Sequence, residues 1–324
     1  KFDFKDMKHN RLLSFFAGVL AIVACTPTYI VKPAPEKGKV DPANVSLLEL
    51  CYNVQEQWEE DREVSRIYVV AHRANTVESF RQGIPDNSLP NIQHAIEAGA
   101  DMVELDVRTT KDGQLVLMHN ETINETTEGF GKVADLTLEE IRKFNMVRSR
   151  KVYRDEQNNT TKVPTLLEAL QLTKDKVYVN LDLAGKSNDP KKILEAINAA
   201  GVADQVMIFA DYDELMSYQR LAPLVAIHPY INNVDDTDRY SGIAAAKLFQ
   251  YGNNVYLNGT VQQFGVRMHE KGYLSYSNLL GEWDEALKKG DYTPLDKFIV
   301  SGSDFIQTDV AELVISYLKE NDLR

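Results

Sequence analysis

Apolar runs of β-branched and aliphatic residues alternate along most of this chain with segments whose apolar residues recur at helical spacing. The apolar runs predict nine strands, at 67–72, 102–108, 115–119, 177–183, 205–210, 224–230, 254–257, 273–278 and 304–308. The helical spacing predicts helices between them, at 88–98, 137–144, 164–174, 190–199, 211–220, 240–249, 260–271, 283–289 and 310–321. Strands that alternate with helices are typical of a parallel barrel or a doubly wound sheet. We therefore expect an α/β fold with one of these two architectures.

Nine strands are one too many for an eight-stranded barrel. The weakest is 254–257, so either this segment or the short segment 115–119 is expected to lie outside the closed sheet. A length of 324 residues fits one large barrel domain with extensions better than two domains. The polar segment 145–162 predicts a long loop, and the helical spacing from Leu47 to Trp58 predicts a helix that precedes the barrel and could cover its base.

A basic segment followed by the apolar run 12–24 stands at the N-terminus. The run is too short to span a membrane and matches the hydrophobic region of a signal peptide. It ends in Ile22-Val23-Ala24-Cys25, which resembles the lipobox of bacterial lipoproteins and implies cleavage before Cys25 and acylation of its sulfur. An ordinary secretory signal or an uncleaved anchor is the alternative.

These features divide the chain into three parts. Residues 1–24 are predicted to be the signal peptide, with Met7 as the true start. Residues 25–43, rich in proline, are predicted to be a lipid-anchored tether, and residues 44–324 the barrel domain. The lipid anchor would make the membrane a partner and would place the protein in a bacterial cell envelope, at the periplasmic side or the cell surface.

The formal charge of −12 and the isoelectric point near 5.1 exclude one class of partner. Proteins that bind nucleic acid need a basic surface for the phosphate backbone, so we expect no nucleic-acid partner. A single phosphate group is still compatible with an acidic protein, because a metal ion or an arginine at the site would bind it.

Strand 102–108 carries the clearest candidate chemistry. Side chains in a strand alternate between two faces, so Glu104 and Asp106 share a face opposite to the apolar residues, at roughly 7 Å Cα spacing. In a barrel covered by helices this face points into the barrel mouth, and the same alternation directs Asp182 there from strand 177–183. Three carboxylates form an oxygen-only site that suits Ca²⁺ or Mg²⁺. The alternative for Asp182 is that it caps a loop.

Two histidines end predicted strands beside these carboxylates. His72 and His119 each follow an apolar run, where an imidazole serves as a general acid or base near neutral pH, or has a structural role instead. His228 also ends a strand and is a weaker candidate. His94 and His269 lie within predicted helices, and we expect His269 on a solvated helix face.

An ordered series of motifs resembles the glycerophosphodiester phosphodiesterase family over roughly residues 66–320. The motifs are His72-Arg73-Ala74, Pro85-Asp86-Asn87-Ser88, Gly99-Ala100-Asp101, Glu104-Leu105-Asp106-Val107, Thr110-Lys111-Asp112-Gly113, His119-Asn120-Glu121-Thr122, Thr126-Thr127-Glu128-Gly129 and Ser303-Asp304-Phe305-Ile306-Gln307-Thr308-Asp309. The resemblance implies a TIM-like barrel in which two histidines act as acid and base around a divalent cation. Position by position, it implies catalytic roles for His72 and His119, a phosphate contact for Arg73, and metal ligands at Glu104, Asp106 and Asp182.

The chain departs from the family's pattern at several positions. The family's third ligand is usually a glutamate followed two residues later by a lysine, and here the pair is Asp182 and Ala184. Without that lysine, Arg73 and the metal would carry more of the charge that develops on the phosphate. The family's glycine after His-Arg is Ala74 in this chain.

The resemblance implies a phosphoric diester hydrolase that converts a small glycerophosphodiester, or a related alcohol phosphodiester, into an alcohol and a phosphomonoester. Two alternatives remain open: a phospholipase C-like or D-like enzyme that acts on intact phospholipid headgroups, and a noncatalytic binding lipoprotein of the envelope. The residues alone leave open which histidine is the acid, and whether water attacks directly or a cyclic phosphate forms first.

Overall fold

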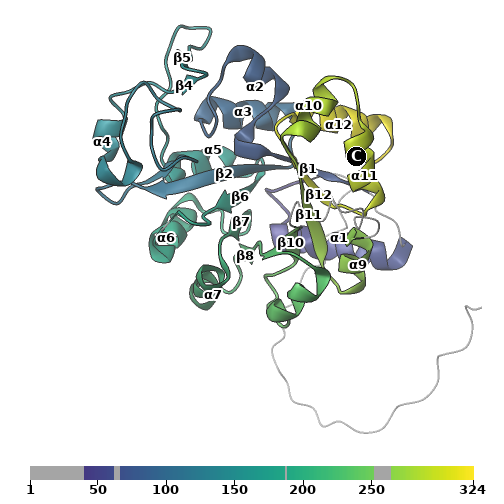
Figure 1. The fold of residues 1–324 in the computed structure, drawn as a ribbon. Coiled ribbons are helices and arrows are strands. Elements are labelled where there is room, and N and C mark those ends of the chain that lie inside the picture. The colour runs from purple at the N-terminus through teal and green to yellow at the C-terminus, as the bar shows by residue number, and fades with distance from the viewer. Residues whose placement is uncertain (1–39, 62–65, 187, 252–263) are drawn as a thin grey trace, which may run out of the picture. The chain divides into compact units, whose positions relative to one another are not determined.

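A parallel sheet that curls into a barrel dominates the computed structural model, which describes residues 40–61, 66–186, 188–251 and 264–324 (Figure 1). The strand order is β8-β7-β6-β2-β1-β12-β11-β10-β9, and every pair along this path is parallel. The strands are β1 (Tyr68–Ala71), β2 (Met102–Thr109), β6 (Tyr178–Asp182), β7 (Val206–Phe209), β8 (Ala226–Ile227), β9 (Tyr230–Ile231), β10 (Leu248–Tyr251), β11 (Leu274–Leu279) and β12 (Phe305–Thr308).

The ends of this path, β8 and β9, are two halves of one barrel strand. His228 and Pro229 separate them, so that β8 pairs with β7 and β9 pairs with β10. Proline has no amide hydrogen to donate, but the Pro229 carbonyl accepts a hydrogen bond from the Gln250 amide at 2.9 Å. Counting β8 and β9 as one strand gives the eight positions of a TIM-like barrel, which confirms the predicted fold class.

β3 (Leu115–Leu117) pairs antiparallel with β2 and lies off the barrel path. This confirms one of the two expected positions for the surplus strand. The other candidate, 254–257, falls outside the described residues.

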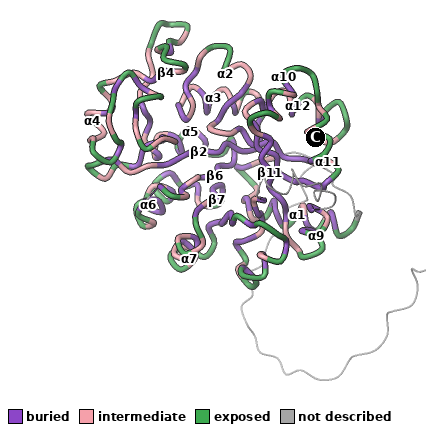
Figure 2. The backbone as a smooth tube through the Cα atoms, viewed as in Figure 1, coloured by how far each residue is buried: buried purple, intermediate pink, exposed green. Residues whose placement is uncertain are grey.

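Helices follow the barrel strands and cover them from outside, so that buried residues gather in the strands and exposed residues in the outer helices and loops (Figure 2). The helices are α2 (Val77–Gln82), α3 (Leu89–Ala98), α4 (Leu138–Ile141), α5 (Leu166–Thr173), α6 (Pro190–Ala200), α7 (Tyr212–Leu221), α9 (Phe264–Glu270), α10 (Glu282–Lys288), α11 (Thr293–Val300) and α12 (Ala311–Glu320). Short 3-10 segments are η2 (His72–Ala74), η3 (Val133–Asp135) and η4 (Val234–Tyr240).

Helix α1 (Leu47–Asp61) precedes the barrel, as predicted, and its apolar side packs on residues that fill the barrel's lower end. Leu47, Leu50 and Cys51 are buried there against strand residues such as Tyr178. The Tyr178 hydroxyl donates a hydrogen bond to the Val45 carbonyl at 2.7 Å, which ties the segment before α1 to β6.

α1 also overturns the prediction for His269. The ring of His269 is buried, stacks on Trp58 with ring centroids 4.8 Å apart, and places Nε2 3.0 Å from Asp304 Oδ1. The sequence of α9 alone does not show that a helix more than 200 residues earlier covers this face.

Two further expectations were wrong. The segment 240–249 was predicted to be a helix, but it contains the end of η4, a turn at Gly242 and the start of β10. The residues from Leu248 form a strand because they pair with β11 inside the barrel. Tertiary pairing overrides the helix preference of the alanines before it. The predicted loop 145–162 contains a two-stranded hairpin, β4 (Val147–Arg148) and β5 (Lys151–Val152).

The predicted signal segment, Cys25 and the tether up to residue 39 lie outside the described residues. Among the residues that the structure does describe, no helix is both long enough and apolar enough to cross a membrane.

Candidate active site

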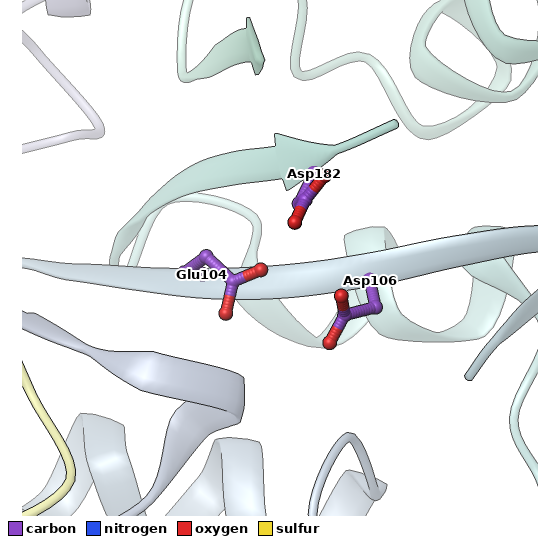
Figure 3. A group of neighbouring side chains, drawn as sticks. All are labelled: Glu104, Asp106 and Asp182. Atoms are coloured by element: carbon purple, nitrogen blue, oxygen red, sulfur yellow. The ribbon is translucent and has the colours of Figure 1, made fainter. Parts of the chain in front are cut away.

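Three carboxylates converge where β2 and β6 run side by side (Figure 3). Asp106 and Asp182 are direct partners in the register of the two strands, and Glu104 lies two residues before Asp106 on the same face. One oxygen from each of the three lies within 4.8 Å of the others. The structure therefore brings together the three predicted ligands, of which Glu104 and Asp106 are 4% and 1% exposed and Asp182 is half-buried.

This crowding sets the protonation of the carboxylates. Burial and the charge of Asp106 raise the pKa of Glu104 to about 8. Burial also raises the pKa of Asp182. For Asp106 burial acts in the same direction, but the charge of Lys186, with smaller effects of His119 and Arg73, outweighs it and lowers its pKa.

The donor set fits a hard divalent cation. Buried Asp106 Oδ1 accepts no hydrogen bond from the described residues, and two neighbouring carboxylates resist ionisation without more positive charge. A cation held by Glu104, Asp106 and Asp182 would satisfy both conditions, since oxygen ligands suit such ions.

Lys186 is a site residue that sequence reasoning missed. Its Nζ lies 2.7 Å from Asp182 Oδ1 and 3.3 Å from Asp106 Oδ1, and the side chain is buried. The chain turns directly after β6, with Gly185 at φ 65° and the Lys186 amide donating to the Leu183 carbonyl at 3.1 Å. We expected that Ala184, in place of the family's lysine, would leave the site without a lysine. This was wrong, because the turn after β6 brings Lys186, four residues after Asp182, to the carboxylates.

His72 follows β1 directly and is held by a carboxylate. Its Nδ1 donates to Asp309 Oδ1 at 2.8 Å, and the Asn75 amide donates to the same oxygen at 2.9 Å. Burial alone would lower the pKa of His72, but the hydrogen bond to Asp309 and the charge of Glu104 outweigh burial and raise it. With Nδ1 engaged, Nε2 faces the carboxylates, 4.0 Å from Glu104 Oε2.

Asp309 was also missed as a site residue, although it closes the last motif of the resemblance. Burial would raise its pKa, but its hydrogen bond with His72 outweighs burial and lowers it. Its amide donates to Asp284 Oδ2 at 2.9 Å, so α10 fixes the backbone that carries it. The available signal in the sequence was that Asp309 directly follows a predicted strand. Only the β1–β12 register, which pairs Ala71 with Thr308, identifies His72 as its partner.

Arg73 occupies the turn between β1 and the helices, where the backbone is left-handed at both Arg73 (φ 50°) and Ala74 (φ 61°). This turn directs the Arg73 amide to Glu104 Oε2 at 2.9 Å and brings Nε to 3.5 Å from Asp106 Oδ2. The Asn87 side-chain amide donates to the same Asp106 oxygen at 2.8 Å. The predicted phosphate contact therefore lies against the metal-ligand candidates.

His119 reaches the site from β3. The Met118 amide donates to the Asp106 carbonyl at 3.0 Å, which returns the chain to the end of β2. His119 Nδ1 lies 2.7 Å from Asn120 Oδ1, so its partner is an amide and not a carboxylate. A pocket of about 230 Å³ opens here, and its walls include Arg73, Asp86, Asn87, His119, Glu125 and Arg148.

His228, the weaker candidate, lies in the barrel core. Its ring packs between Phe209 and Tyr276, with centroids 5.4 and 4.3 Å away, and it is fully buried. Burial lowers its pKa to about 3. Neither ring nitrogen has a hydrogen-bond partner among the described residues, and His228 does not line the pocket.

Comparisons with known proteins identify the family of this chain. The model of the glycerophosphoryl diester phosphodiesterase family matches residues 72–272. A glycerophosphodiester phosphodiesterase of Caldanaerobacter subterraneus subsp. tengcongensis is 28% identical over 272 residues, which is 78% of this chain and 98% of that protein.

Solved structures show the same fold. A glycerophosphoryl diester phosphodiesterase from Parabacteroides distasonis superposes with a TM-score of 0.69 at 20% identity, over 87% of this chain and 95% of that one. A phosphodiesterase from Oleispira antarctica, solved in complex with the product sn-glycerol-3-phosphate, gives 0.60 at 22% identity, over 78% of this chain and 96% of that one. Because the family model spans more than half of the chain, this protein belongs to the glycerophosphoryl diester phosphodiesterase family and is a phosphoric diester hydrolase.

Proposed function

We propose that the protein hydrolyses small glycerophosphodiesters to an alcohol and a phosphomonoester, with Ca²⁺ or Mg²⁺ held by Glu104, Asp106 and Asp182. One observation carries the proposal: two buried carboxylates and the half-buried Asp182 meet within 4.8 Å, next to a histidine that a fourth carboxylate orients. Such a bound cation supplies positive charge to a nonbridging phosphate oxygen and to the attacking hydroxyl.

The chain's own cations complete the phosphate site. Arg73 lines the pocket, and the ammonium of Lys186 lies between Asp182 and Asp106, 2.7 and 3.3 Å from their oxygens. Both are within reach of the position that a phosphate next to the cluster would take. They therefore stabilise the negative charge that builds up on the phosphate in the transition state.

The two histidines move the protons. Both have Nδ1 engaged, which leaves Nε2 to exchange a proton with the substrate. A carboxylate partner stabilises an imidazolium, whereas an amide oxygen does so less. We therefore assign His72 as the acid that protonates the leaving alkoxide, and His119 as the base that removes a proton from the attacking hydroxyl.

Leaving-group dependence tests this assignment. With glycerophosphoglycerol, H72A and H119A should each lower kcat roughly 10²-fold or more, the usual contribution of positioned proton transfer. With the p-nitrophenyl ester of glycerol 3-phosphate, whose leaving group departs without a proton, H72A should lose far less activity and H119A as much as before. If H72A lost equal kcat with the two substrates, His72 would not be the acid that protonates the leaving group. H94A is the matched control.

The pocket favours this function over action on intact lipids. Its walls carry the charged side chains of Arg73, Asp86, Glu125 and Arg148, which suit a headgroup phosphodiester rather than acyl chains. The His72–Asp309 pair and the carboxylate cluster also argue against a noncatalytic binding lipoprotein.

A substrate panel separates the three possibilities. The purified chain should release glycerol 3-phosphate from glycerophosphocholine and glycerophosphoinositol and leave intact phosphatidylcholine and phosphatidylinositol uncleaved. Cleavage of the intact lipids alone would support the phospholipase alternative, and binding without turnover would support the noncatalytic one.

We also propose that acylated Cys25 holds the protein in the cell envelope. The support is the sequence Ile22-Val23-Ala24-Cys25 after the apolar run 12–24. Expression of the full chain in a bacterium should place it in the membrane fraction, and C25S should release it. An unchanged distribution of C25S would contradict the lipid anchor.

A further inference from the structure

The β4–β5 hairpin forms a wall shared by two pockets. Arg148 and Ser149 line both the pocket beside Arg73 and His119 and a second pocket of about 540 Å³ between the hairpin and α2. Figure 1 shows the hairpin beside α2. A molecule bound in the first pocket, which Arg73 and His119 also line, could therefore extend past Arg148 into the second pocket.

The second pocket is basic, in a chain whose formal charge is −12. Arg81, Arg148, Lys151 and Arg154 line it, and no acidic side chain among the described residues does. Arg81 pairs with Glu78 outside the pocket. Within the described part of the chain, neither Lys151 nor Arg154 forms an ion pair.

The hairpin holds positive charge in a costly arrangement. Arg148 and Lys151 are directly opposite each other in the β4–β5 register, where like charges destabilise a strand pair. The two-residue turn between them places Ser149 (φ 50°) and Arg150 (φ 64°) in the left-handed region that favours glycine. Local costs of this kind persist in proteins mainly where function requires them.

Arg148 itself has unused donors. Its side chain is 10% exposed, and one nitrogen binds Asp86 and Asn75. Nε and Nη1 are buried without a hydrogen-bond partner among the described residues. An anion between the hairpin and α2 would satisfy these donors and separate the like charges of Arg148 and Lys151.

We propose that the second pocket binds a second phosphate group on the alcohol portion of the substrate, so that the enzyme prefers phosphodiesters whose alcohol is itself phosphorylated. This inference rests on the proposed function and narrows its substrate class. The volumes agree with it, because the first pocket alone lies below the usual range for ligand sites of roughly 300–1,000 Å³ and the second lies within that range.

The test compares glycerophosphoglycerol with bis(glycerophospho)glycerol, which carries the same linkage and one more phosphodiester group. The wild-type enzyme should have the higher kcat/KM for the second compound, and the advantage should shrink with added salt. In the double variant K151Q/R154Q the ratio of the two kcat/KM values should fall roughly fivefold, as for two partly exposed ion pairs. Turnover of glycerophosphoglycerol should stay unchanged.

The control is K319Q/K297Q, which removes two positive charges on α12 and α11, outside the lining of the pocket. Equal ratios in the wild type and K151Q/R154Q would overturn the inference and leave the proposed function intact. The same holds if the variant lost binding to phosphatidylglycerol vesicles while keeping its ratio, since the patch would then contact a lipid surface. If the wild type hydrolysed neither compound, the proposed function would fail, and calorimetric binding of the two compounds would still decide the role of the pocket.

Discussion

The inner and outer halves of the active site are built differently. The inner half is formed by Glu104 and Asp106, which are buried, and by His72, which is half-buried. The Arg73 backbone amide, the Asn87 side chain and the Asp309 carboxylate hold these three side chains. The outer half, formed by His119 and the β4–β5 hairpin, lines open pockets, and its polar partners are amides and single carboxylates.

The difference separates two tasks. Reacting groups must be held within a fraction of an ångström, and rigid neighbouring strands with buried hydrogen bonds provide that precision. Recognition of variable alcohols tolerates a looser wall, and loops beyond the strand ends vary without disturbing the barrel. Damage to the inner half should therefore lower kcat, whereas changes in the outer half should mainly alter substrate preference.

The largest effect should come from the carboxylates of β2. E104Q and D106N should lower kcat/KM roughly 10³-fold, because several kcal/mol of charge stabilisation would depend on the proposed cation. D182N should cost less, since Asp182 is half-buried and already paired with Lys186. Steady-state kinetics at saturating cation would measure this order, and a D182N variant more damaged than D106N would reverse our ranking of the ligands.

The partners of the two histidines provide a direct contrast between the halves. D309N keeps the size of the side chain but removes the charge that orients His72, so kcat should fall roughly 10²-fold. N120A removes only an amide partner of His119 and should change kcat severalfold at most. Similar losses in both variants would show that the inner and outer histidines are held equally tightly.

Lys186 lies beside the inner half. Its removal should lower kcat without weakening the binding of the cation. Its ammonium shares Asp106 and Asp182 with the proposed cation, so K186M should bind Ca²⁺ at least as tightly as the wild type. It should nevertheless lower kcat roughly tenfold or more, because a charge that stabilises the transition state is lost. Calorimetry and kinetics on K186M and the surface control K192M would show whether the two effects separate; weaker Ca²⁺ binding in K186M would contradict this role.

Substitution of His228, which lies in the barrel core outside both halves of the active site, should have the smallest effect on catalysis. Its folded pKa of about 3 lies below the ordinary value of 6.5, so the unfolded chain binds a proton that the folded chain does not. Its unfavourable contribution to stability therefore grows as pH falls through the window from 6.5 towards 3, by up to about 1.4 kcal/mol per pH unit.

H228L should remove this part of the acid sensitivity and leave kcat near its wild-type value at neutral pH. Urea unfolding at about pH 7 and about pH 5 would measure the difference between the two proteins. A kcat loss as large as that of H72A would place His228 in the chemistry, against its position in the core.

The inner half was largely predictable from the sequence, and the physical reason is the strand period. Alternation in 102–108 directs Glu104 and Asp106 to one face, and the same rule for 177–183 directs Asp182 to them. Residues that local pattern could not assign depend on contacts between distant segments. Asp309 meets His72 through the β1–β12 register, and Lys186 enters through a turn whose geometry its sequence did not reveal.

The outer half was poorly predictable for the same reason. A segment rich in basic and polar residues looked like a loop, yet Val147 and Val152 pair in a hairpin with a left-handed turn of non-glycine residues. The fold shows a similar limit at β10, where the helix preference of alanines near 245 lost to strand pairing.

The central claim is that the inner carboxylates hold a divalent cation on which hydrolysis depends. The most direct test follows glycerophosphoglycerol turnover by the purified chain as excess EDTA is added and as Ca²⁺ or Mg²⁺ is then titrated back. We predict that activity disappears with the chelator while the circular dichroism spectrum stays unchanged, and returns in proportion to the ion bound by calorimetry. Full activity in excess EDTA, or turnover that returns without ion binding, would contradict the account.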